Sequence, residues 1–460
     1  MAIYNTFLIF LDMSFFGFIA SNTEFPIKET NVHEIQIALK HNKLTSRQLV
    51  EFYLTQIESL NPLLRSVIEV NPEALFLADK ADRERNAKSL VSQSSLLHGI
   101  PILLKDNIAT KDKLNTTAGS YALLSSVVAR DAGVVAKLRK AGAIILGKAS
   151  MTEWAAFRSY KLPNGWCARA GQVGVWIISR TSLRPFLPHS SKRCRFDQNH
   201  VVLFISFSLS ANFVQTLWVL FSTSIEHSNQ KKENGKEKQS YQHRLPSFPS
   251  NFPPMFGIKI INLSLNNFNG KNPYVKSTDP CGSSTRSAVS VAANMVTLSH
   301  GTETAGPIYR TVSDAVYVLD AIVGFDPYDV VATRKALKYI PHDGYVQFLK
   351  VDGLRGKRLT SYPFYSFTNN SDISQAFKLH FNTLRQRGAI LVDGLDIPNF
   401  VAIMNFVLND QDIALLAEFS LSVNDYLKDL LTSPVRSLAD AIAFNKKFLD
   451  LVRTTIPFQH

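Results

Sequence analysis

Cysteine is scarce in this sequence, which has three in 460 residues: Cys167, Cys194 and Cys281. Three thiols at irregular spacing form neither a disulfide framework nor a zinc site. No histidine lies at a sequence spacing from any of them that would indicate a catalytic cysteine. A buried or unreactive thiol is therefore the favoured interpretation, and a catalytic thiol is the alternative. An internal repeat is also absent, which excludes the repeat architectures.

Acidic residues are too few to balance the basic ones, and the net charge is +13. A basic protein can attract an anionic partner. More than half of the excess lies between Val173 and Gly270, where eleven basic residues accompany four acidic ones. Because the charge belongs to one segment and no nucleic-acid-binding motif goes with it, we expect no nucleic-acid partner.

Long apolar runs occur in only two places. Residues 1–21 predict a signal peptide or a simple apolar N-terminus, because the run ends in small residues but lacks a basic start. A signal would imply the secretory pathway, and the cytoplasm is the alternative. The second run, 201–225, is long enough to predict a membrane helix. It lies within 173–270, a segment without periodic pattern that interrupts the domain expected over 31–460.

The rest of the chain alternates helical and strand-like patterns. From Asn31 to about Ser89 the pattern is helical, with Thr45 and Ser46 as candidate caps. Further patterns predict a buried strand ending at Lys105, a helix then a strand in 131–150, a helix and turn in 287–303, a capped helix in 311–325, strands in 356–362 and 389–398, and C-terminal helices. Such alternation predicts an α/β fold with a parallel or mixed sheet under helical cover.

Lys105 is the most informative single residue. It ends the apolar run "GIPILL" and is followed by Asp106 and Asn107. Burial at the end of a strand disfavours the charged form of an amine, which lowers its pKa and lets it act as a base. The alternatives are a lysine paired with Asp106 and one whose amine extends to solvent.

Two glycine-containing turns carry small hydroxyl residues. The first, "DPCGSSTRSA" (279–288), precedes a helix, where its hydroxyls and N–H groups suit nucleophile activation or anion binding; an ordinary serine cap is the alternative. The second, "GTETAGPIYRTVSDA" (301–315), has glycines that let successive N–H groups point inward as an oxyanion hole. Pro307 stands where this second turn closes.

In this order the motifs resemble the amidase signature family, in its plant-type branch. The stretches "LHGIPILLKDNI", "TTAGSYAL", "NPYVKSTDPCGSS", "GTET" and "RTVSDAVYVLDAIVGFD" carry the resemblance, which covers nearly all of 31–172 and 271–450. It implies the amidase signature fold, a mixed central β-sheet covered by helices on both faces. It also implies hydrolysis of carbon–nitrogen bonds in small amides, giving a carboxylic acid and ammonia or an amine, with no cofactor or metal.

The resemblance further implies a Ser–cisSer–Lys triad. Lys105 would be the base, Ser283 the bridging serine after a cis peptide bond from Gly282, and Ser284 a supporting hydroxyl. The nucleophilic serine is expected twenty-four residues after Ser283, and that position is Pro307, which has neither a hydroxyl nor an N–H. The N–H groups implied for the oxyanion hole are those of Thr304, Ala305 and Gly306.

Other departures from the family pattern accompany Pro307. A few dozen residues that should follow Gly306 are missing, 173–270 looks inserted, and the last family helices are not reached. Arg286 replaces a glycine, and we expect it to strain the serine turn. Fold disruption by insertion and deletion is therefore expected.

Several interpretations stay open at this point. The chain is an imperfect amide hydrolase, a non-catalytic remnant of one, or a protein attached to a membrane through 201–225. A substitute nucleophile would have to be Thr302, Thr304 or Ser313, and a transamidation role within a larger complex is a further alternative. The oligomeric state is not predicted.

Overall fold

The computed structural model describes residues 25–88, 95–159, 162–171, 283–296, 298–300, 306–360, 371–392 and 399–452. The predicted signal region and the segment 173–270, with its apolar run, lie outside these residues. Within the described parts of the chain, no helix is both long and apolar enough to cross a membrane.

A five-stranded mixed sheet forms the centre of the fold, in the order β1–β3–β2–β4–β5. β2 pairs in parallel with β3 and β4, whereas β1 and β5 pair antiparallel at the two edges. Every residue of β2 and β3 is buried, as expected for apolar strands covered on both faces. The strands are β1 (Val67–Val70), β2 (Pro101–Lys105), β3 (Ile144–Ala149), β4 (Leu298–His300) and β5 (Pro307–Tyr309).

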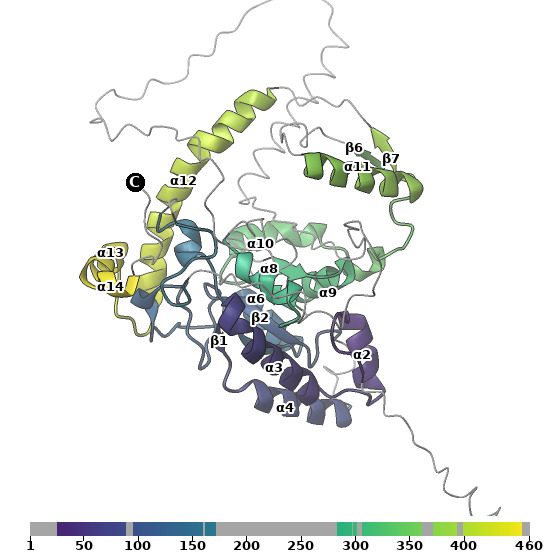
Figure 1. Ribbon diagram of the computed structural model, residues 1–460, viewed down its shortest axis with the longest axis horizontal. Helices are drawn as coiled ribbons and strands as arrows, with labels where there is room; N and C mark the ends of the chain where they lie inside the picture. Colours follow the sequence, from purple (N-terminus) through teal and green to yellow (C-terminus); the bar gives the residue numbers. More distant parts are fainter. Residues whose placement is uncertain are drawn as a thin grey trace, which may run out of the picture.

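Helices cover this sheet on both sides, with α3 and α4 below the strands and α8 and α9 above them in Figure 1. α4 packs on α3 and on β3, and α8 contacts all five strands. The observed sheet and its cover confirm the predicted α/β fold. The helices around the sheet are α2 (Val32–Lys40), α3 (Ser46–Leu64), α4 (Ala74–Asn86), α6 (Gly133–Lys140), α8 (Thr285–Ala292) and α9 (Val312–Ile322).

Helix α3 shows how the sequence pattern becomes packing. Thr45 is its N-cap, and the Thr45 side chain and the Gln48 side chain each satisfy the other residue's main-chain N–H. Behind this cap the apolar side chains recur at helical spacing and lie on one buried face. They are Leu49, Val50, Tyr53 and Ile57.

Two sequence predictions were wrong about local structure. The helical segment expected over 31–89 is broken by β1, which pairs with β3. β4 follows α8 where a turn was expected, because a three-residue strand has too few positions to show a period. Pro307 begins β5 opposite His300, and a proline is tolerated as the first residue of an edge strand. The turn before it, 301–305, lies outside the described residues.

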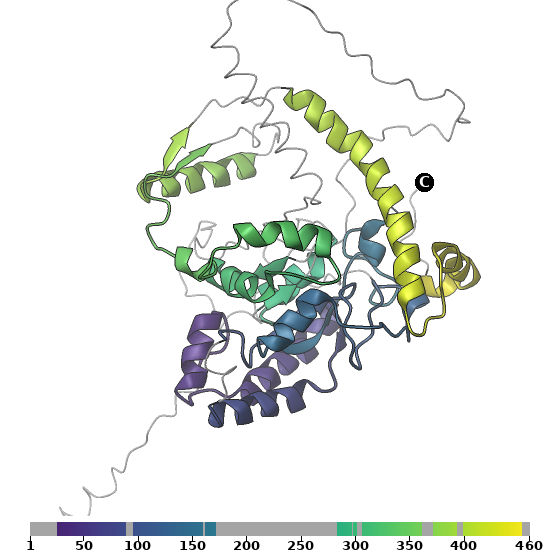
Figure 2. The ribbon, with the colours of Figure 1, turned by 180° about the vertical axis from the view of Figure 1, so that it is seen from behind.

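The chain beyond α9 continues with α10 (Val330–Ala336), the parallel pair β6 (Arg358–Thr360) and β7 (Ile390–Val392), and α11 (Ser371–Gln386). It ends in α12 (Phe400–Asp429), α13 (Leu438–Lys447) and α14 (Leu449–Val452). These elements confirm the strands predicted in 356–362 and 389–398 and the C-terminal helices. Figure 2 shows α12 along one side of the molecule, with α13 and α14 at its foot.

A second, smaller core joins this C-terminal region to the short helix η1 (Tyr121–Leu123). Leu427 of α12 and Ala441 of α13 are buried with Ala122 and Leu123. The main chain adds a bridge nearby, because Val127 and Thr432 pair antiparallel. The C-terminal helices are thereby fixed to the segment that follows β2.

Candidate active site

Lys105 lies at the end of β2, the middle strand of the sheet, and its side chain is completely buried. Its Nζ donates to Ser283 Oγ and to Ser284 Oγ, each at 2.9 Å. The alternative of a lysine that extends to solvent is therefore wrong. The strand end and the serine turn, far apart in sequence, meet as the order of the motifs predicted.

The two serines stand at the beginning of α8. Ser284 occupies the N-cap position, where a serine hydroxyl ordinarily accepts a hydrogen bond from a main-chain N–H of the first turn. Here α8 has no side-chain cap hydrogen bond, and the Ser284 hydroxyl accepts from Lys105 instead. Ser283 is partly exposed, and its carbonyl accepts the N–H of Thr152. An ordinary serine cap is thus not what the structure shows.

The remaining residues implied for the site are only partly described. Thr304 and Ala305 lie outside the described residues, as does Gly282, so the peptide bond before Ser283 is outside them too. Gly306 is described and leads directly into β5, where Pro307 pairs with His300. The roles given to Thr304, Ala305 and Gly306 therefore stay predictions, as does the assignment of the nucleophile position to Pro307.

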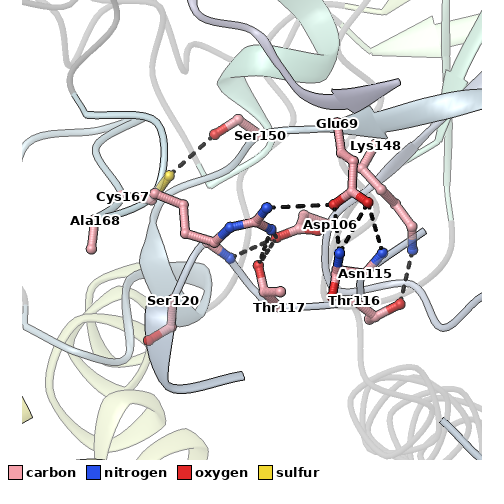
Figure 3. Close-up of polar contacts among 12 residues, drawn as sticks. Glu69, Asp106, Asn115, Thr116, Thr117, Ser120, Lys148, Ser150, Cys167 and Ala168 are labelled. Carbon is pink, nitrogen blue, oxygen red and sulfur yellow. Dashed lines mark hydrogen bonds and ion pairs between the residues drawn. The ribbon is translucent and has the colours of Figure 1, made fainter. Parts of the chain in front are cut away.

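A buried cluster of charges adjoins Lys105, and it is centred on Asp106 (Figure 3). The Asp106 carboxylate accepts hydrogen bonds from the Thr117 hydroxyl and from the Gly119 N–H, the latter at 2.8 Å. Arg169 Nη1 lies 3.9 Å from the same oxygen. Burial raises the pKa of Asp106, while the positive charges of Lys148 and Arg169 act against that rise. Asp106, the residue after Lys105, is thus held by Thr117, Gly119 and Arg169.

Lys148, on β3, is the second fully buried lysine of the site. Its Nζ donates to the Ile108 carbonyl at 2.5 Å and to Thr116 Oγ1 at 3.0 Å. Burial lowers the pKa of Lys148 to about 8, although the nearby charges of Asp106, Asp112 and Glu69 favour the protonated form. The Lys148 amine therefore loses its proton at a pH only slightly above neutral.

The low pKa of Lys148 makes stability depend on pH. Between pH 8 and its ordinary value of 10.5, the unfolded chain binds this proton more readily than the folded chain, so stability rises with pH. We expect the free energy of unfolding to rise by about 2 kcal/mol more in the wild type than in Lys148→Met between pH 7.5 and 9.5. Urea unfolding of both proteins at the two pH values measures this, and parallel changes would contradict it.

Arg286 lies in the first turn of α8 and is completely buried. Its guanidinium donates to three main-chain carbonyls, those of Gly165, Arg65 and Gly171. Its φ is not in the left-handed region that favours glycine. Residues 279–282 of the serine turn lie outside the described residues, so the expected strain of that turn stays a prediction. Burial lowers the pKa of Arg286 to about 10.

Cys167 is a buried thiol whose Sγ lies 3.2 Å from Ser150 Oγ (Figure 3). Burial raises the pKa of this thiol, which disfavours the reactive thiolate. The interpretation of Cys167 as a buried, idle thiol is confirmed, and the other two cysteines lie outside the described residues.

Several known proteins are similar to this chain in sequence. A family profile described as "Amidase" matches residues 48–163. A probable amidase of Arabidopsis thaliana is 40% identical, over 93% of this chain and 70% of the relative. This chain belongs to the amidase signature family. Members of that family hydrolyse amide bonds, which supports the coarse function that the motifs implied.

Two further comparisons place this amidase-family chain among longer proteins. A putative amidase of Schizosaccharomyces pombe is 29% identical, over 92% of this chain and 64% of its own length. The X-ray structure of native peptide amidase from Stenotrophomonas maltophilia superposes with a TM-score of 0.64 at 29% identity, over 94% of this chain and 74% of that one. The predicted amidase signature fold is confirmed, and the chain spans less than the full length of each relative.

The cluster around Asp106 is the part of the amidase site that the sequence prediction missed. A signal for it existed, because Lys148 ends the apolar run "AIILGK" much as Lys105 ends "GIPILL". The argument that singled out Lys105 as a buried strand-end lysine applies equally to Lys148. Thr116, a partner of Lys148, and Thr117, a partner of Asp106, carry no such lysine signal, because they come from a loop that only the fold brings to these residues.

Proposed function

We propose that this chain hydrolyses the carboxamide bond of small amides, with Lys105 as general base and Ser283 as the hydroxyl that passes protons. The observation that carries the proposal is the 2.9 Å hydrogen bond between Lys105 Nζ and Ser283 Oγ, made by a fully buried amine. Family membership supports the reaction type.

The roles follow from the contacts. A neutral Lys105 amine takes the proton of Ser283 Oγ, which in turn takes a proton from an attacking water. The water oxygen bonds to the carbonyl carbon, the carbon–nitrogen bond breaks, and the proton on Nζ passes back through Ser283 to the leaving nitrogen. Ser284 Oγ is a second acceptor for Nζ, so the amine has little freedom to turn away. Burial favours the neutral amine that such a base requires.

Turnover is impaired in this proposal, because Pro307 stands where the family pattern has the nucleophile. Proline has no hydroxyl to attack with and no N–H to hold an oxyanion. Its position in β5, opposite His300, also fixes the main chain there as a strand. The N–H groups of Thr304, Ala305 and Gly306 remain the proposed oxyanion hole.

The substrate class is a primary carboxamide, including the terminal amide of a short peptide. A native peptide amidase is among the similar solved structures, and its name motivates a peptide amide as the test substrate. Esters and peptide bonds within a chain are the comparison substrates.

Ammonia release tests the proposal. The purified chain, its Lys105→Met variant and a Lys140→Met control, altered at the end of α6, are incubated with a dipeptide amide. We expect slow release from the wild type and the control, and at least about a 100-fold loss in Lys105→Met, the usual size of a general-base effect. Release that survives in Lys105→Met would remove the base role. No release from the wild type would show a non-catalytic relative instead.

A further inference from the structure

Ser283 differs from the other hydroxyls around the start of α8. Its Oγ lies 2.9 Å from Lys105 Nζ, and the residue is partly exposed. Ser284 makes the same contact but is buried, at 9% exposure. Ser287, one turn further along α8, is completely buried, and its Oγ has no hydrogen-bond partner among the described residues. Ser283 therefore combines contact with the base and access from outside.

The start of α8 adds a favourable electrostatic field. The N-terminus of a helix carries a partial positive charge from its main-chain N–H groups, and it stabilises a nearby negative charge. Ser283 comes directly before the N-cap residue Ser284, whose hydroxyl faces Lys105 and makes no cap hydrogen bond. Negative charge that develops on Ser283 Oγ is thus next to the N-terminus of α8.

We propose that Ser283 is itself the acyl acceptor of this chain. The inference rests on the proposed function only in taking Lys105 as the base. Neutral Lys105 Nζ takes the proton of Ser283 Oγ, and Oγ bonds to the carbonyl carbon of an activated acyl donor such as an aryl ester. The carbon–oxygen bond to the leaving group breaks, and the phenolate leaves with the electron pair.

The acyl-serine is then removed by water. Lys105 returns its first proton to solvent and accepts one from the attacking water, whose oxygen bonds to the carbonyl carbon. The bond from that carbon to Ser283 Oγ breaks, and Oγ takes the proton back from Nζ. The reaction thus needs two residues, Lys105 and Ser283, where the family pattern uses three.

A fluorophosphonate probe tests this without any turnover. In the reaction, Ser283 Oγ would bond to phosphorus, fluoride would leave, and Lys105 would take the hydroxyl proton. The resulting phosphonyl-serine adduct is stable. The wild type, Ser283→Ala, Lys105→Met and Ser287→Ala are treated with the probe, intact mass is followed over time, and the labelled peptide is sequenced by tandem mass spectrometry. Ser287→Ala is the matched control, since it removes a nearby hydroxyl, from the first turn of α8.

We expect one adduct per chain on Ser283, an unchanged rate in Ser287→Ala, and at least a 10-fold slower rate in both Ser283→Ala and Lys105→Met. Circular dichroism shows which variants are folded. A folded Ser283→Ala variant that labels as fast as the wild type would overturn the inference, as would an adduct on another residue.

The outcomes also separate this inference from the proposed function. Labelling of Ser283 without ammonia release from the dipeptide amide would support the acyl acceptor and remove the hydrolase. Ammonia release that depends on Lys105, combined with no adduct on Ser283, would keep the hydrolase and return Ser283 to the part of a proton relay.

Discussion

Replacing Asp106 by alanine should lower the free energy of unfolding by about 3 to 5 kcal/mol, the usual loss when one partner is removed from a buried set of charges. The Asp106 carboxylate is completely buried and accepts from Thr117 and the Gly119 N–H. Without it, the buried amine of Lys148 and the guanidinium of Arg169 lose one shared negative neighbour, and Glu69 remains as the other.

Urea unfolding of Asp106→Ala, Asp106→Asn and Asp343→Ala measures this effect and its origin. Asparagine keeps an oxygen for Thr117 and Gly119 but removes the charge, so its loss should lie between those of the wild type and the alanine variant. Asp343 is largely exposed and serves as the surface control. An Asp106→Ala variant within about 1 kcal/mol of the wild type would show that the cluster does not hold the strand end.

The Arg286→Ala variant should also lose about 3 to 5 kcal/mol of stability. The substitution empties a large buried volume and leaves the carbonyls of Arg65, Gly165 and Gly171 without the guanidinium. These carbonyls come from two segments, the end of α3 and residues 162–171, and their common donor connects both to the first turn of α8.

Two further variants separate the contribution of the buried volume of Arg286 from that of its hydrogen bonds. Arg286→Met refills most of the volume without donors, and we expect it to be more stable than Arg286→Ala by about 1 to 2 kcal/mol. Arg286→Gly restores the residue that the family pattern has at this position. If thermal unfolding showed Arg286→Gly to be more stable than the wild type, the Arg286 side chain would destabilise the folded state, contrary to our expectation.

The sequence was informative about the fold wherever the signal was local. The cap at Thr45, the apolar strand before Lys105 and the helix over 311–325 all depend on neighbours within a few residues, and each was predicted. β4 and β5 were not, because three-residue strands exist only through their partners.

The candidate site, too, was predictable from the sequence only in part. Lys105 and Ser283 were found because each motif is short and their order matches a family. From the sequence, Ser284 could have been either a helix cap or a partner of the strand-end lysine, and only the three-dimensional position of Lys105 shows that its hydroxyl contacts that lysine. The three carbonyls that surround Arg286 could not be foreseen, since they lie far from it in sequence.

The strand order also has a consequence for synthesis in the cell. β2 carries Lys105 in the middle of the finished sheet, but β4, which covers its second edge, is translated long after β3. At about 5 to 20 residues per second, about 8 to 30 s pass between the emergence of Ala149 and that of His300. During that time the apolar residues of β2 present an open edge on the ribosome. The yield of folded protein should therefore depend on the rate of translation relative to the rate at which this exposed edge aggregates.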